Sequence, residues 1–204
     1  LAGSLLEAGA DAGPLAERAA ALARGGADAA AVAAGLVDEG SLVLGTDADA
    51  LLPLADVVVA ATSSTAPVLR PGQLRPGAVV CDVARPLDAD PAVGLERPDA
   101  LVVEGGLVEL PEGADLGWDF GLPPATVFAC MCEPMMLALE RRYELARVGV
   151  ETPPELLRTL RGWAAEHGFR PAPPRSFGRP VSDEDWRRVR AARAGGIASP
   201  VRGA

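Results

Sequence analysis

Three short runs of mostly apolar, β-branched residues stand out in the middle of the chain. They cover residues 57–61, 79–82 and 101–104, and they do not alternate with polar positions. Continuous runs of this kind are typical of parallel strands that are buried on both faces. A weaker run predicts a further strand at residues 42–45. Strands separated by short Pro- and Asp-rich connections at this spacing predict an open α/β sheet.

Helical spacing and capping signals flank these strands on both sides. A long helix is expected from Pro123 to about Arg147, because its apolar residues recur at helical spacing. Residues 182–185 resemble a capping box that opens a last short helix. The other expected helices cover residues 14–24, 27–35, 47–54, 90–96 and 153–167.

The carboxyl ends of the predicted strands carry small and polar residues. Parallel α/β sheets bind their ligands at this edge. The residues expected there are Thr62, Ser63, Ser64, Asp82, Gly105 and Gly106. From the residues alone, the hydroxyl cluster after the first strand reads equally as a capped turn, and Asp82 either orients a ligand or caps the turn before Pro86.

A dinucleotide-binding fold starts with a strand and a Gly-rich turn, and no G-x-G-x-x-G occurs in these 204 residues. Either this protein binds no dinucleotide, or the N-terminal part of such a domain is missing from the chain, and we favour the second. We therefore expect residues 1–169 to form an incomplete, doubly wound Rossmann-like domain that lacks its N-terminal Gly-rich strand-turn. Leu1–Ser4 would be the stub of a strand. Residues 170–204, rich in proline and arginine, are expected to form a partly disordered tail.

The composition excludes one catalytic mechanism and disfavours one class of partner. The chain contains no lysine, so no Schiff-base lysine exists in it, and its net charge is −9. Residues 170–204 hold eight arginines against three acids, which leaves a strongly acidic body that does not suit nucleic-acid binding. No signal peptide and no apolar stretch of about 20 residues is visible, so we expect no transmembrane segment and a cytoplasmic location.

The three cysteines are Cys81, Cys130 and Cys132. Their odd number argues against a secreted disulfide framework. A zinc site would need all three together with His167, so free thiols and no metal are expected.

Residues 56–106 resemble a segment of shikimate dehydrogenases and glutamyl-tRNA reductases. The similar pieces are ADVVVAATSSTAPVL, RPGAVVCDVARPLDADPAV and LVVEGG. The resemblance implies an NADP-binding domain in which Thr62, Ser63 and Ser64 lie near the nicotinamide end of NADP. Gly105 and Gly106 would border the same cofactor.

Residues 101–171 resemble the C-terminal part of the long-chain acyl-carrier-protein reductases. Four pieces occur in that family's order: GGLVE, WDFGLPP, FACMCEPMMLALE and AEHGFRP. The resemblance implies that Cys130 is a nucleophile that carries an acyl group as a thioester. The chain departs from the family at Cys132 and Pro134, and the acyl-binding N-terminal region and the Gly-rich loop are absent from it.

Three functions are open at this point. In the first, NADPH reduces an acyl thioester, on acyl carrier protein or coenzyme A, to an aldehyde through Cys130. In the second, a shikimate- or amino-acid-dehydrogenase-like enzyme transfers hydride directly and Cys130 only packs. In the third, the chain is a module that docks partners. Cys132 is expected to pack. Glu133 is expected to face solvent, with an acid or base role as its alternative, and His167 to cap a helix, with a general-acid role as its alternative.

Overall fold

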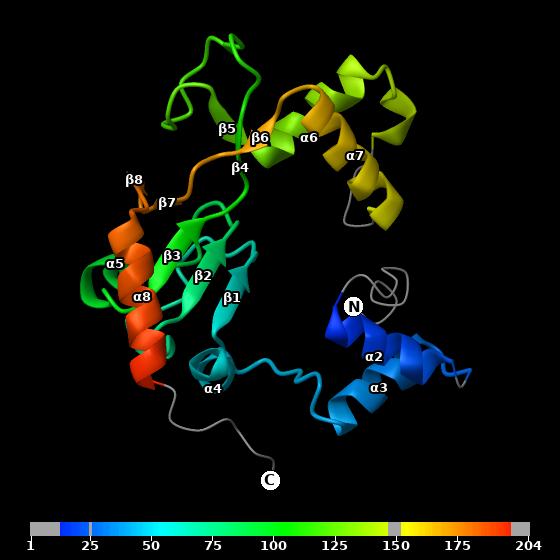
Figure 1. Cartoon of the computed structure of the whole chain (residues 1–204), viewed down its shortest axis with the longest axis vertical. Coiled ribbons are helices and arrows are strands. Elements are labelled where there is room, and N and C mark those ends of the chain that lie inside the picture. The colour runs from blue at the N-terminus through cyan, green and yellow to red at the C-terminus, as the bar shows by residue number, and fades with distance from the viewer. Residues whose placement is uncertain (1–12, 25, 147–151, 197–204) are drawn as a thin grey trace. The chain divides into compact units, whose positions relative to one another are not determined.

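The three apolar runs form a parallel sheet, as predicted. In the computed structural model, which describes residues 13–24, 26–146 and 152–196, the strands are β1 (Val57–Ala60), β2 (Val79–Asp82) and β3 (Leu101–Glu104). Their order is β1-β2-β3, and Val57 aligns with Val79 and Val79 with Leu101 (Figure 1). The α/β class is therefore confirmed, while a complete doubly wound Rossmann arrangement stays a prediction.

One face of this sheet carries the main core. Val58, Val80 and Val102 share that face, and Val80 and Val102 are almost fully buried. The helix α5 (Pro91–Glu96) and the 3-10 turn η3 (Pro71–Gln73) follow β2 and β1, and Val93 of α5 joins the same cluster. Burial of branched side chains against each other supplies most of the stabilisation of such a layer.

The other face of β1 differs from the expectation that the strands are buried on both faces. Val57 is 61% and Val59 is 70% exposed, and both lie on the face opposite Val58. Within the described residues β1 is an edge strand that pairs with β2 alone, so its side chains have fewer neighbours than those of the central strand. The continuous apolar run thus predicted the strand correctly, but the prediction that both of its faces are buried was wrong.

A second, antiparallel sheet follows β3. It contains β4 (Leu107–Glu109), β5 (Thr126–Phe128) and β6 (Arg170–Pro171), in the order β5-β4-β6. The helix α6 (Ala129–Leu139) starts directly after β5. The prediction of one long helix from Pro123 was therefore wrong at its N-terminal end, because residues 126–128 pair with β4 instead of coiling.

The predicted strand at residues 42–45 was also wrong, because these residues form no strand or helix. Val43 and Leu44 are more than half exposed. The helix α4 (Ala48–Leu51) with the 3-10 turn η2 (Leu52–Leu54) follows this run, as expected for residues 47–54.

The chain divides into two units. One contains Leu1–Thr46 with Arg147–Gly162, and the other contains Asp47–Ala146 with Trp163–Ala204. This division differs from the expected boundary at residue 169. In the first unit, α2 (Pro14–Ala23) and α3 (Ala29–Asp38) pack through Ala19, Val32 and Leu36. The expected strand stub at Leu1–Ser4 lies outside the described residues.

The expected tail contains regular structure. A short hairpin of β7 (Arg175–Ser176) and β8 (Arg179–Pro180) leads into α8 (Asp183–Gly196). The predicted capping box is present, since the Ser182 hydroxyl accepts the Asp185 N–H and the Asp185 carboxylate accepts the Ser182 N–H. Arg193 of α8 donates to the carbonyl oxygens of Gly77 and Asp56, at 2.9 and 3.0 Å. Much of the segment from residue 170 is thus part of the sheet unit.

The helix α7 (Pro154–Glu166) agrees with the predicted helix over 153–167, and Gly168 follows it with a φ of 83°. Its residues fall on both sides of the division between the units. None of the helices in the described part of the chain is long and apolar enough to cross a membrane.

Candidate functional site

The hydroxyl groups that follow β1 are engaged in local hydrogen bonds. The Thr62 N–H and hydroxyl donate to the two carboxylate oxygens of Asp88, at 2.9 and 2.5 Å, and Asp88 is fully buried. The Ser64 hydroxyl donates to the Ala66 carbonyl, at 2.7 Å. Ser63 between them is exposed. This arrangement is that of a capped turn, and a contact of Thr62, Ser63 and Ser64 with NADP stays a prediction.

Asp82, at the end of β2, is also committed to the backbone. It is fully buried, and its two oxygens accept the N–H groups of Ala84 and Ala89, at 3.1 and 2.8 Å. A carboxylate with this burial and these partners has little capacity left for a ligand. Of its two sequence interpretations, the geometry supports the cap of the turn before Pro86.

Gly105 and Gly106 join β3 to the second sheet and to α6. The Gly105 N–H donates to the Asp82 carbonyl at 2.8 Å, and a Cβ on Gly105 would lie 2.5 Å from the Val83 side chain. Gly106 has a φ of 69°, and its carbonyl accepts the N–H of Ala129, the first residue of α6, at 2.7 Å. The glycines thus bring the start of α6 to the carboxyl edge of the sheet.

Cys130 is the second residue of α6, and it is exposed. The sequence placed it about two turns into a helix, which was wrong because β5 takes residues 126–128. Phe128, at the N-cap, has no side-chain group that could accept the N–H groups of the first turn. Such N–H groups and the helix dipole attract anions. Cys130 therefore lies where the backbone presents positive potential.

Arg85 is a residue of this edge that the sequence reasoning missed. Its guanidinium lies 5.2 Å from the centre of the Phe128 ring, and it donates to the Gly105 carbonyl at 3.2 Å. Stacking and hydrogen bonding hold an arginine head group in a defined place. Its position three residues after Asp82, next to the end of a strand, was the signal that could have found it. We use "carboxyl edge" below for Arg85, Gly105, Gly106, Phe128 and Cys130.

The other two cysteines are less accessible. Cys132 is 3% exposed, and burial, followed by the charge of Cys130, raises the pKa of its thiol. Its interpretation as a packing residue is confirmed. Cys81 is half-buried next to Gly105, where a Cβ would lie 2.8 Å from its sulfur atom. In the described residues, no three His, Cys, Asp or Glu side chains gather in a way that could hold a metal ion.

His167 contacts Glu140. Its Nε2 lies 2.6 Å from Glu140 Oε1, and both side chains are about 30% exposed. Its backbone N–H donates to the Trp163 carbonyl, at the end of α7. The imidazole therefore has a carboxylate partner in addition to its place at a helix C-terminus.

Comparison with known proteins shows that the chain is similar to part of a larger protein. The chain is 32% identical over 139 residues to aminotransferase PigE of Serratia sp. (strain ATCC 39006), and the match covers 67% of this chain. It covers only 16% of the relative, so this chain spans about a sixth of that protein's length. No family model matches the sequence.

This similarity corrects the functional expectation. The relative is named for amino-group transfer, which is a different class of enzyme from an NADP-dependent reductase. The expected reduction of an acyl thioester and the alternative dehydrogenase with direct hydride transfer are both contradicted by it. At the coarser level the relative's name indicates an enzyme, so the chain is similar to part of a larger enzyme.

Proposed function

We propose that this chain is a ligand-binding domain of a larger enzyme related to aminotransferase PigE and that it lies outside the aminotransfer centre. The observation that carries this proposal is the partial match, which involves most of this chain but 16% of the relative. A segment of that size with its own parallel sheet is suited to one domain of a multidomain enzyme.

The composition supports the second half of the proposal. Enzymes that use pyridoxal phosphate hold it as a Schiff base on a lysine. These 204 residues contain no lysine, so they do not fit that cofactor. The amino-group chemistry of such an enzyme would therefore belong to other parts of it.

The carboxyl edge is the best candidate for the ligand of this domain. The Arg85 guanidinium and the start of α6, which has no side-chain cap, both favour an anionic group. Arg85 is held in place by Phe128 and Gly105. Cys130 adds an exposed thiol to the same edge. The ligand we propose is a small molecule with a phosphate or carboxylate group next to Cys130. NADP is one molecule of this kind, and its binding stays a prediction.

Thiol labelling tests the edge directly. Labelling residues 1–204 with a maleimide, followed by peptide mass spectrometry, should modify Cys130 well before Cys132, because only Cys130 is exposed. Inorganic phosphate or NADP should slow the labelling of Cys130 at constant ionic strength, with chloride as the reference salt. Arg85→Gln should remove this protection, whereas Arg190→Gln, on the exposed side of α8, should retain it.

Two results would overturn the proposal. Labelling of Cys130 at an unchanged rate in both phosphate and NADP would show that the carboxyl edge does not bind such anions. Turnover of an amino donor and a keto acid by residues 1–204 with added pyridoxal phosphate would show that this chain holds an aminotransfer centre after all.

A further inference from the structure

The face of the parallel sheet opposite the main core carries apolar side chains close to the carboxyl edge. Val59 of β1, Cys81 of β2 and Val103 of β3 are aligned across the three strands on this face. Val59 is largely exposed, and Cys81 and Val103 are half-buried. We use "apolar strip" below for the side chains of this face and its continuation beyond β2: Val57, Val59, Cys81, Val83 and Val103.

Gly105 connects the apolar strip to the carboxyl edge. A Cβ on Gly105 would lie 2.5 Å from the Val83 side chain and 2.8 Å from the Cys81 sulfur atom, so Gly105 lies directly beside both. The carbonyl of the same glycine accepts a hydrogen bond from the Arg85 guanidinium, at 3.2 Å. A ligand that binds to Arg85 therefore has side chains of the apolar strip next to it.

The apolar strip is unusual for a parallel sheet, because such sheets are normally covered on both faces. The core face is covered by α5, since Val93 packs in one cluster with Val80 and Val102. On the opposite face, Val57, Val59 and Val83 are 61%, 70% and 40% exposed. Neighbouring apolar side chains that stay exposed are a common feature of ligand-binding surfaces.

The side chains of the apolar strip favour a flat group. Four of the five are valines and the fifth is a cysteine, so all of them are short. Aromatic rings pack favourably against β-branched side chains on the face of a sheet. The strip offers no charged group and no amide to the polar atoms of a ligand. These properties suit an aromatic hydrocarbon ring.

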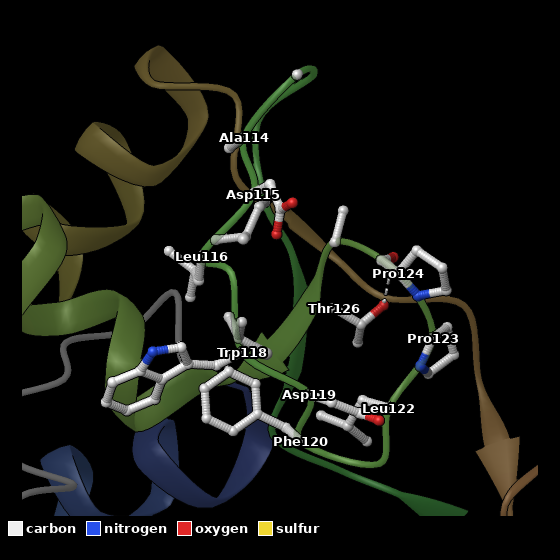
Figure 2. A pocket seen from close by; sticks show the side chains of 14 residues that line it. Ala114, Asp115, Leu116, Trp118, Asp119, Phe120, Leu122, Pro123, Pro124 and Thr126 are labelled. Atoms are coloured by element: carbon white, nitrogen blue, oxygen red, sulfur yellow. Dashed lines mark hydrogen bonds between the residues drawn. The ribbon is translucent and has the colours of Figure 1, made fainter.

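A cavity in the same unit offers a ring a second place but offers an anion none. The loop of residues 110–125 encloses about 600 Å³, and Trp118 and Phe120 lie next to each other at one end of it (Figure 2). Its charged groups are Asp115 and Asp119, which lie on different parts of the loop and accept nearby glycine N–H groups. Among the described residues no arginine lines this cavity.

We infer that the ligand of the carboxyl edge is an anion that carries an aromatic hydrocarbon ring. Its anionic group lies at Arg85 and the start of α6, and its ring lies on the apolar strip. The ring site rests on the proposed function, since it needs the anionic group at Arg85. It adds the chemical class of the ligand and the surface that selects it.

Two native thiols report the two parts of such a ligand separately. Phenyl phosphate and methyl phosphate have the same charged group, and only the first carries a ring. In maleimide labelling of residues 1–204, both should protect Cys130, phenyl phosphate at about tenfold lower concentration because its ring covers apolar surface. Only phenyl phosphate should also slow the labelling of Cys81, which lies in the strip. Benzyl alcohol, a ring without the charge, should protect neither thiol at the same concentration.

Three variants locate the ring. Val59→Ser should remove most of the advantage of phenyl phosphate over methyl phosphate and leave the effect of methyl phosphate unchanged. Val43→Ser is the same change at a similarly exposed position of the other unit, and it should respond to both esters as the unchanged protein does. Trp118→Leu should also respond as the unchanged protein does, because the ring does not lie in the loop cavity.

The outcomes separate the ring site from the proposed function. If neither ester protects Cys130, the proposed function and the ring site both fail. If the two esters protect Cys130 equally, or if phenyl phosphate leaves the labelling of Cys81 unchanged, only the ring site fails. A dimer of residues 1–204 in analytical ultracentrifugation that Val59→Ser dissociates would show that a second copy covers the strip, and it would also overturn the ring site.

Discussion

Gly105 and Gly106 are neighbours, but they are required for different reasons. A side chain on Gly105 would collide with Val83 and Cys81, whereas nothing lies within 4 Å of a side chain on Gly106. Gly106 instead has a φ of 69°, which residues with a Cβ rarely adopt. One glycine is thus needed for space and the other for backbone conformation.

These two requirements respond differently to a second substitution. Gly105→Ala should lower the free energy of unfolding by about 2 kcal/mol through overpacking, and Gly106→Ala by about 1 kcal/mol through its left-handed conformation. In a Val83→Ala background the cost of Gly105→Ala should fall, while that of Gly106→Ala should not change. Urea unfolding of the two glycine variants, of Val83→Ala, of the two double variants and of the unchanged protein measures both costs in both backgrounds. An unchanged cost of Gly105→Ala in Val83→Ala would contradict the collision.

The sequence located the residues that directly follow the parallel strands, but not their hydrogen-bond partners. Thr62 follows the first apolar run and Asp82 ends the second, so the ends of the runs are enough to locate both residues. The bond from Thr62 to Asp88 joins residues 26 positions apart, through a turn whose path depends on the whole sheet. Arg85 was missed for the same reason. Its guanidinium is held at this edge by the ring of Phe128, which belongs to a different sheet.

Among the helices and strands, the features that depend on residues close in sequence could be predicted. The three parallel strands and the capping box of α8 depend on neighbouring residues. The start of α6 depends on a distant pairing, since residues 126–128 form β5 only because β4 is available to them. The apolar stripe of the helix continues into these three residues, so spacing alone could not separate strand from helix.

The capping box of α8 leads to a prediction about pH. The guanidinium of Arg179, together with the N–H and hydroxyl of Ser182, holds the pKa of Asp185 well below its usual range. Because the pKa is lower in the folded protein, the carboxylate stabilises the fold above its unfolded pKa, near 4, and this stabilisation is lost as the pH falls below that value.

Asp185→Asn should therefore lower the free energy of unfolding at pH 7, by about 1 kcal/mol for a weakened cap. The difference from the unchanged protein should shrink between pH 4 and pH 2.5, as measured by urea unfolding across this range. Asp183→Asn removes the same charge from an exposed position two residues earlier, and it should show little of either effect. A difference that is the same at pH 7 and pH 2.5 would contradict a role of the ionised carboxylate.

On the scale of the whole molecule, the sheet unit is completed by residues from far along the chain. Arg193 donates to the carbonyl of Gly77, 116 positions earlier, and Val189 is buried beside Val93 and Val102. Gly77 must lack a side chain here, because a Cβ would lie 2.5 Å from the Cβ of Arg193. The composition of residues 170–204 predicted a basic tail. It could not predict their folded structure, because that structure depends on contacts with residues far away in the sequence.

Replacement of Arg193 tests this attachment. Arg193→Gln removes the hydrogen bonds to Gly77 and Asp56 and should lower the free energy of unfolding by about 1–2 kcal/mol. Arg190→Gln is a matched change on the exposed side of the same helix and should cost little. Urea unfolding compares the two, and equal effects would show that α8 is held without Arg193.

The late arrival of α8 has a consequence for biosynthesis. At translation rates of about 5–20 residues per second, Gly77 leaves the ribosome roughly 6–23 s before Arg193, 116 positions later, follows it. During this interval the nascent sheet has no cover over the surface that Val189 later occupies. Nascent chains with exposed apolar surface are bound by chaperones or aggregate. The yield of folded protein should therefore respond to chaperone supply more strongly than the stability of the finished fold would indicate.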